Sequence, residues 1–332
     1  MSEITRRSLL AGAAAIPAAI AASPAALASD WRPARPTRII VPAPPGGITD
    51  IAARLLAGRV QEAWGQPCVV DNRAGGGGVI GTTEFLRAAP DGHTMLVGNI
   101  GPQATAYSLF RALPFAPEAF TPASGLIRGP NVLVVHPSVR ANTVAEFIAL
   151  LRQPGQAMNY GSSGIGQSPH LSAVWFLQVT GGQATHVPFR GSAPALTELL
   201  AGNIQFMFEN LIAAAQHIQS GRLRALAVTT AARSPLFPDL PALRETAPDL
   251  GAYDVSTWAA LFGHAATPRD AVLAWNAQAR ALLQTPETIT RLRQAGSDPH
   301  VTTQEEFAAF VAAEVAKWGE VIRREGLVLE MN

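Results

Sequence analysis

The pattern that most constrains the fold is an alternation of short apolar runs with amphipathic helical stretches. The apolar runs have the length of β-strands, and intervening stretches such as 50–64 and 168–179 repeat their apolar residues at helical spacing. Strand candidates are residues 38–41, 68–71, 94–98, 131–136, 158–160, 185–189, 204–209, 224–229 and 256–263. Strands that alternate with helices predict mainly parallel sheets with helices on both faces, and hence an α/β fold.

The chain also shows signs of two domains. Two segments rich in proline or glycine, 127–131 and 234–253, have the composition of crossings between lobes. After the second the pattern becomes helix after helix, and Thr303 with Glu306 fits a capping box at the start of the last helix. We therefore expect residues 29–130 and 250–332 to form domain 1 and residues 131–249 to form domain 2. A ligand cleft is expected between the domains, where the carboxyl ends of their strands face each other.

The first 28 residues have the features of an export signal. Arg6-Arg7 is followed by an alanine-rich apolar stretch and by a small-residue cleavage pattern that ends at Ala28. The paired arginines resemble a twin-arginine signal. Two prolines interrupt the stretch, which argues against a permanent membrane anchor. We expect cleavage near Ala28-Ser29 and a soluble, exported mature chain.

Composition argues against several kinds of partner and cofactor. The formal net charge is only +1 and no basic block occurs, which is unfavourable for binding nucleic acid or an anionic membrane. Cys68 is the single cysteine, so one chain can form neither a disulfide nor a cysteine-rich metal site. The seven histidines lack the spacing of a metal site, and we expect no bound metal.

The first candidate binding corner follows the strand-like run Ile39-Ile40-Val41. A proline-rich turn leads into Gly46-Gly47, and a helix begins near Thr49-Asp50. The bare start of a helix offers unpaired N–H groups and positive potential to an anion. No Gly-Lys-Ser/Thr ending is present, so a carboxylate is a better candidate than a phosphate. The alternative is a tight corner that Thr49 merely caps.

Further corners of the same kind follow later strands. Residues 159–171 form a loop with donors at Ser162, Ser163, Gly164, Gly166 and Ser168, and with His170 just inside the next helix. Arg190-Gly191 offers a guanidinium at another corner, either for a carboxylate or as a surface arginine. Asn99 and Asn210 each end a strand.

Two classes of enzyme, a dinucleotide-dependent oxidoreductase and a hydrolase, would use parts of these corners. Gly76, Gly78 and Gly81 match a dinucleotide-binding spacing, but the next strand ends in Asn99 instead of the expected acidic residue, which favours close helix–sheet packing. A hydrolase would need Ser163 or Ser168 to be oriented by a histidine, and neither lies in a nucleophile elbow. The corners offer hydrogen-bond donors without an activated nucleophile, and this favours binding over catalysis.

Longer stretches of the sequence resemble one family. "PTRIIVPAPPGGITDIAARLLAGRVQEAWGQPCVVDNRAGGGGVIGTTEFLRAAPDGHTMLVGN", "HVPFRGSAPALTELLAGNIQFMFENL" and "EFAAFVAAEVAKWGEVIRREGL" are similar to the solute-binding proteins of tripartite tricarboxylate transporters, the Bug-type family. The similarity extends over essentially the whole mature chain.

The resemblance implies a two-lobed, type II-like periplasmic binding protein that has no catalytic activity and no cofactor. It implies a monomer that captures a small organic acid and delivers it to the membrane permease subunits of a tripartite transporter. Together with the corners above, it gives as ligand-binding residues Pro44, Gly46, Gly47, Ile48, Thr49, Asp50, Asn99, Ser162, Ser163, Gly166, Gln167, Ser168, His170, Phe189, Arg190, Gly191 and Asn210.

The sequence departs from the family pattern at several of these positions. Gln167 and Pro169 stand where threonine and serine are typical, and Phe189 replaces a frequent tyrosine. We therefore expect a ligand with a less polar or bulkier tail than a plain dicarboxylate. An exported oxidoreductase with a nucleotide cofactor and a ligand sensor for a membrane kinase are the alternatives.

Overall fold

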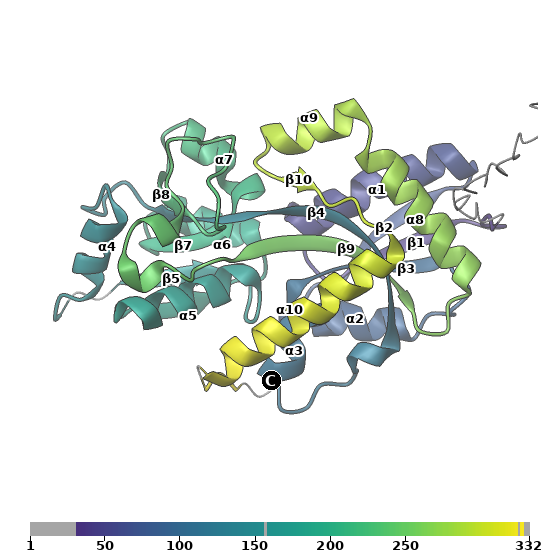
Figure 1. Cartoon of the computed structure of the whole chain (residues 1–332), viewed down its shortest axis with the longest axis horizontal. Helices are drawn as coiled ribbons and strands as arrows, with labels where there is room; N and C mark the ends of the chain where they lie inside the picture. The colour runs from purple at the N-terminus through teal and green to yellow at the C-terminus, as the bar shows by residue number, and fades with distance from the viewer. Residues whose placement is uncertain (1–30, 156–157, 325, 329–332) are drawn as a thin grey trace, which may run out of the picture.

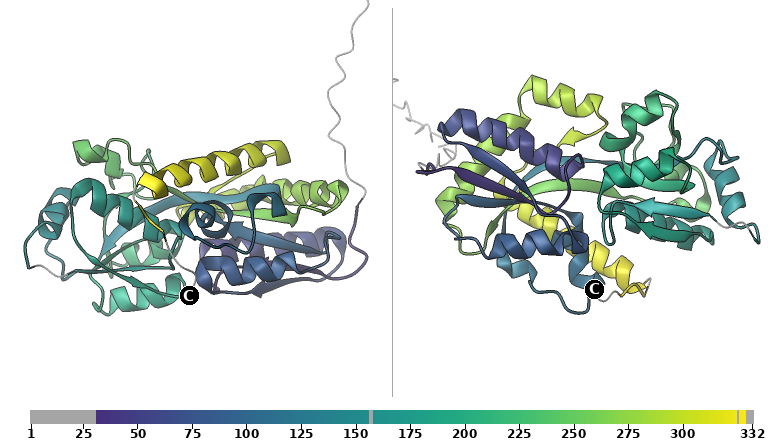
Figure 2. Two further views of the ribbon diagram at one scale, coloured as in Figure 1. Left: turned by 90° about the horizontal axis from the view of Figure 1, so that it is seen from below. Right: turned by 180° about the vertical axis from the view of Figure 1, so that it is seen from behind.

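The computed structural model describes residues 31–155, 158–324 and 326–328. The predicted signal peptide and its cleavage site lie outside this part of the chain. Two lobes lie at opposite ends of the long axis in all three views (Figures 1 and 2).

The first lobe contains a sheet in which parallel strands adjoin antiparallel ones. β2, β1 and β3 run parallel, and β3 then pairs antiparallel with β9. Its strands are β1 (Thr37–Val41), β2 (Cys68–Asn72), β3 (Thr94–Asn99), β9 (Ser256–His264) and the short β10 (Asp298–Pro299). Its helices are α1 (Ile48–Trp64), α2 (Val79–Leu86), α3 (Ala106–Leu109), α8 (Arg269–Leu283), α9 (Pro286–Gln294) and α10 (Gln304–Arg324).

The second lobe repeats the arrangement on a smaller scale. β7, β5 and β6 run parallel, and β4 pairs antiparallel with both β7 and β8. Its strands are β5 (Asn159–Ser162), β6 (Thr185–Pro188), β7 (Phe206–Asn210) and β8 (Arg224–Val228). Its helices are α4 (Val144–Leu151), α5 (Ser168–Thr180), α6 (Ser192–Leu200) and α7 (Leu211–Gln219).

One long strand, β4 (Phe120–Val135), belongs to both lobes (Figure 1). Residues 120–130 pair with β9, and residues 131–135 pair with β7 and β8. The prediction began this strand only at residue 131 and took residues 127–131 for a crossing between lobes. β4 runs through this segment and contains two register shifts against β9, one between Pro122 and Ser124 and one between Gly125 and Ile127.

The hydrophobic cores explain why the helices cover the sheets as they do. One core contains Phe147 and Phe176 of the second lobe together with Trp258, Phe307 and Trp318, so it is continuous across the two lobes. α10 packs on β4 and α3 along this face. The predicted α/β, two-lobed fold is confirmed, with β4 and β9 as antiparallel strands beside the parallel ones. None of the helices in the described ranges is both long and apolar enough to cross a membrane.

Candidate functional site

A cavity of about 1000 Å³ lies where strand ends of both lobes meet. The predicted residues that line it are Pro44, Gly47, Ile48, Thr49, Asn99, Ser163, Gln167, Ser168, Phe189, Arg190, Gly191 and Asn210. Five others, Gly46, Asp50, Ser162, Gly166 and His170, are not among its lining residues. The predicted set of ligand-binding residues left out the lining residues Pro42, Ala43, residues 74–80, Phe110, Gly164, Ile165, Pro169, Pro188, Ser192 and Thr257, although Gly164 was expected as a donor of its loop.

The first-lobe corner is a glycine turn that runs into an uncapped helix. Gly46 has φ +90°, a conformation that favours glycine, and Gly47 is the N-cap of α1 without a side-chain cap. The first N–H groups of α1 therefore have no partner within the helix, and Ile48 and Thr49 bring them to the cavity.

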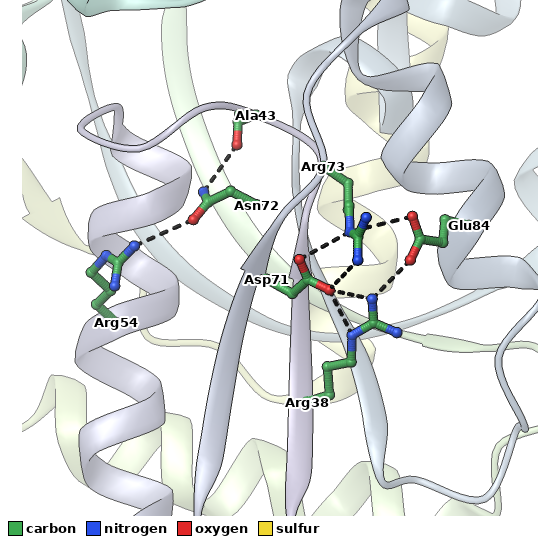
Figure 3. Close-up of polar contacts among 7 residues, drawn as sticks. All are labelled: Arg38, Ala43, Arg54, Asp71, Asn72, Arg73 and Glu84. Atoms are coloured by element: carbon green, nitrogen blue, oxygen red, sulfur yellow. Dashed lines mark hydrogen bonds and ion pairs between the residues drawn. The ribbon is translucent and has the colours of Figure 1, made fainter.

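Asp50 stabilises this turn without lining the cavity. Its carboxylate accepts hydrogen bonds from the Gly46 N–H (3.0 Å), from Arg54 (3.0 Å) and from Asn72 (3.0 Å). Burial raises the pKa of Asp50, but these three hydrogen bonds outweigh burial and hold the pKa below its ordinary value. Asn72 also donates to the Ala43 carbonyl (Figure 3), so the strand ends of β1 and β2 are tied together.

An ion cluster fixes the chain that enters the glycine-rich loop after β2. Arg38 pairs with Asp71 and, at 2.8 Å, with Glu84, and Arg73 pairs with Asp71 at 2.9 Å (Figure 3). The loop itself, Gly75–Gly78, has positive φ at all four glycines and lines the cavity. Gly81 fits the packing interpretation, because a Cβ there would lie 2.4 Å from the Arg73 carbonyl oxygen.

Asn99 determines whether the Thr49 hydroxyl acts as a donor or an acceptor toward the cavity. The Asn99 side chain donates to the Thr49 hydroxyl oxygen (3.0 Å) and accepts from the Gly101 N–H (2.9 Å). The hydroxyl proton of Thr49 is therefore left for another acceptor. This arrangement adds a hydrogen-bond donor beside the α1 N-terminus.

The second-lobe loop before α5 rests on two stacked histidines. The ring centroids of His170 and His186 lie 4.3 Å apart. Nδ1 of His170 accepts a hydrogen bond from the Gly166 N–H (3.2 Å), and Nε2 of His186 lies 2.7 Å from the Ser162 hydroxyl oxygen. Burial lowers the pKa of His170 to about 3, with a smaller effect from His186, and burial lowers the pKa of His186 to about 4. Both rings are therefore neutral near pH 7 and act as supports for the loop.

The Ser162–His186 pair does not form a hydrolase site. Ser162 is fully buried and does not line the cavity. His186 has Tyr160 stacked on its other face, at 4.8 Å, and no carboxylate is paired with it among the described residues. Of the two serines that a hydrolase was predicted to use, Ser168 contacts Asn131 (3.4 Å) instead of a histidine, and Ser163 lines the cavity.

The two lobes touch on both sides of the cavity. On one side the Gln167 amide donates to the Gly77 carbonyl (2.8 Å) and the Thr105 hydroxyl donates to the Gly166 carbonyl (2.8 Å). On the other side a Cβ built on Gly191 would lie 2.4 Å from Pro44. The structure therefore represents a closed arrangement, in which glycine is required for the close approach.

The helices that begin at the cavity share one feature. α1, α2, α5, α6 and α7 begin there, and none has a side-chain cap. Away from the cavity, α4 and α9 have threonine caps and α10 has the predicted Thr303–Glu306 capping box, whereas α8 begins without a side-chain cap.

The charge of the lining residues has the same sign as the potential at the uncapped helix starts. Among the described lining residues, Arg190 is the charged one, and it is exposed at the rim. The cavity therefore offers free N–H groups and positive potential to an anion. Within the described ranges, no group of three or more His, Cys, Asp or Glu side chains is placed to hold a metal ion.

Comparison with known proteins gives a consistent set of relatives. Residues 52–327 match the model of the tripartite tricarboxylate transporter family receptor. The chain is 35% identical over 310 residues to protein BugT of Bordetella pertussis, covering 92% of this chain and 94% of that protein.

Solved structures of similar chains have the same fold. An R. palustris protein, Rpa4515 with adipate, has a TM-score of 0.86 and 34% identity over 90% of this chain and 100% of that one. MatC from Rhodopseudomonas palustris with bound malate has a TM-score of 0.82 and 30% identity over 87% of this chain and 99% of that one.

Proposed function

The chain belongs to the tripartite tricarboxylate transporter family of receptors, and from this premise we propose that it captures a small carboxylate-bearing molecule for a tripartite transporter. The family and its structural relatives are periplasmic solute-binding proteins and not enzymes. The oxidoreductase and hydrolase alternatives are therefore wrong for this chain.

The observation that supports a carboxylate is the set of uncapped helix starts around one cavity. An acid group at Gly47–Thr49 would receive hydrogen bonds from main-chain N–H groups and from the Thr49 hydroxyl. The relatives solved with adipate and malate bind acids, which supports the same chemistry here. The cavity also offers apolar surface from Ile80 and Phe110 to a less polar tail.

The remaining parts of the proposal concern export, cellular location and delivery of the ligand. We propose export with removal of residues 1–28, action in the periplasm as a monomer, and delivery of the acid to permease subunits. The lobes would be residues 29–130 with 250–332 and residues 131–249, and they would close over the acid.

Substitution of Gly47 tests the site. Gly47→Val places a branched side chain where the acid group would approach, while its backbone, at φ −87° and ψ 172°, accepts any residue. We expect at least a tenfold loss of affinity in calorimetry for the best binder from a panel of organic acids, because the N–H groups become inaccessible. The matched control is Gly58→Val in the same helix, where open space surrounds the glycine. Equal affinities for both variants would remove this corner from the site.

A further inference from the structure

We propose that Glu209 takes up a proton when an acid enters the cavity, so that capture of the carboxylate and protonation of Glu209 are coupled. This inference rests on the proposed capture of a carboxylate. Glu209 is the penultimate residue of β7, before Asn210, behind the lining of the cavity, and its side chain is 0% exposed.

The hydrogen bonds of Glu209 are concentrated on one oxygen. Oε1 accepts from the Ser192 hydroxyl (2.9 Å) and from the Asn210 N–H (2.7 Å). Oε2 is buried and has no partner among the described residues. An ionised carboxylate in such a place has unsatisfied acceptor capacity, whereas a protonated carboxyl keeps both Oε1 bonds and loses its charge.

Only one side chain separates Glu209 from the proposed acid site. Ser192 lines the cavity, and its hydroxyl oxygen would lie 3.9 Å from a Cβ on Gly47, across the cleft. An acid held at Gly47–Thr49 would bring a second negative charge close to Glu209, whose own side chain is shielded from solvent. Like charges at this range raise the pKa of the group that can still accept a proton.

No charged side chain on the surrounding elements offsets this repulsion. The titratable groups on the elements packed against β7 are Glu198 on α6, His217 on α7, His170 on α5, Tyr160 on β5 and Arg128 on β4, with Arg224 on β8, His186 on β6 and Arg190 at the cavity rim beyond them. Burial raises the pKa of Glu209 to about 7, against its two hydrogen bonds, and none of these groups contributes among the described residues.

The coupled step is balanced as follows. The acid binds as its carboxylate, a proton from bulk solvent bonds to Oε2 of Glu209, and this proton compensates one of the negative charges that the acid brings. No covalent bond between heavy atoms forms or breaks. Above the pKa of free Glu209, affinity for the acid should therefore fall by up to about tenfold per pH unit.

The test is calorimetry of adipate and of malate binding at pH 8 in phosphate and in Tris, buffers that differ in ionisation enthalpy. The wild-type protein should take up close to one proton per acid, and Glu209→Gln, which mimics the protonated carboxyl, should take up none. Glu198→Gln in α6 is the matched control and should behave as wild type, because Glu198 is only partly buried, does not line the cavity, and glutamine can still accept the hydrogen bond from Asn203 (2.7 Å). Binding without proton uptake by wild-type protein would overturn this inference and leave the carboxylate proposal standing, whereas failure of both acids to bind would count against the proposed function.

A second measurement needs no ligand. Because the pKa of Glu209 is raised on folding, wild-type protein should lose stability relative to Glu209→Gln as pH rises from about 4.5 to 7. The difference in Tm between the two proteins should therefore be larger at pH 8 than at pH 5. A difference that does not change with pH would also overturn the inference.

Discussion

Thr105→Val is expected to weaken ligand binding although Thr105 does not line the cavity. Thr105 lies in the π-helical turn Gly101–Thr105 of the first lobe and is 0% exposed. Its hydroxyl proton is shared between the Gly101 carbonyl of the same turn (3.0 Å) and the Gly166 carbonyl of the second lobe (2.8 Å). Valine has nearly the same shape, so the variant removes a bond between the lobes without opening a void.

The magnitude follows from what happens to the Gly166 carbonyl. A net hydrogen bond contributes about 1 kcal/mol, and a buried carbonyl left without a donor costs about 1–3 kcal/mol. In an open form water can reach this carbonyl, so the cost falls on the closed, ligand-binding form alone. We expect binding to weaken by about 1–2 kcal/mol, which is about 5- to 30-fold in Kd.

The assay is calorimetric titration with the best-binding acid, beside small-angle scattering of the free protein. Thr180→Val is the matched control, because Thr180 is 1% exposed and its hydroxyl donates to the Phe176 carbonyl of its own helix (2.6 Å). It lies at the far end of α5, about 18 Å along the helix from the cavity. The reasoning is refuted if Thr105→Val binds as tightly as Thr180→Val, or if free Thr105→Val is no more open than wild type.

Two further predictions concern charge. Arg190→Ala should weaken binding of diacids about 2- to 5-fold more than binding of monoacids of equal length, because an exposed guanidinium contributes about 0.5–1 kcal/mol to the binding of a second negative charge. Equal losses of affinity for both kinds of acid, measured by calorimetry, would make Arg190 an ordinary surface residue. Stability should fall as pH drops from 7 to 5, because buried His170 and His186 stay neutral in the folded state, with lowered pKa values, but gain protons in the unfolded state near pH 6.5. His170, 7% exposed, should contribute about 2 kcal/mol to that fall at pH 5, so urea unfolding of His170→Asn should depend less steeply on pH, and an unchanged slope would contradict this.

Much of the fold could be predicted because the signals are local. Alternating apolar runs and helical periods marked the strands, and the capping pair Thr303–Glu306 marked the start of α10. The first eleven residues of β4 were missed, because prolines and glycines give this segment no strand signal and its pairing with β9 is a tertiary contact.

The candidate site was predicted in part for the same reason. A glycine corner between a strand and a helix is visible in the sequence, and Gly47, Gly191 and Asn210 were found in this way. Ser192 lies next to a predicted residue, but only the fold shows that its hydroxyl faces Gly47 and is bound to Glu209. Gly76 and Gly78 were assigned to packing together with Gly81, and these two glycines both permit close packing and line the cavity.

By itself the sequence determined the secondary structure, the positions where bare helix starts follow strands, and the family. These properties depend on residues within a few positions of one another, so a local pattern carries them. Only the tertiary structure decided which corners face each other: Thr105 meets Gly166, and Gly77 meets Gln167, across 61 and 90 positions of sequence. The tertiary structure also decided that Glu209 is buried behind the site. The burial of a side chain and its distance from other charges depend on how the lobes pack and not on neighbours in the chain.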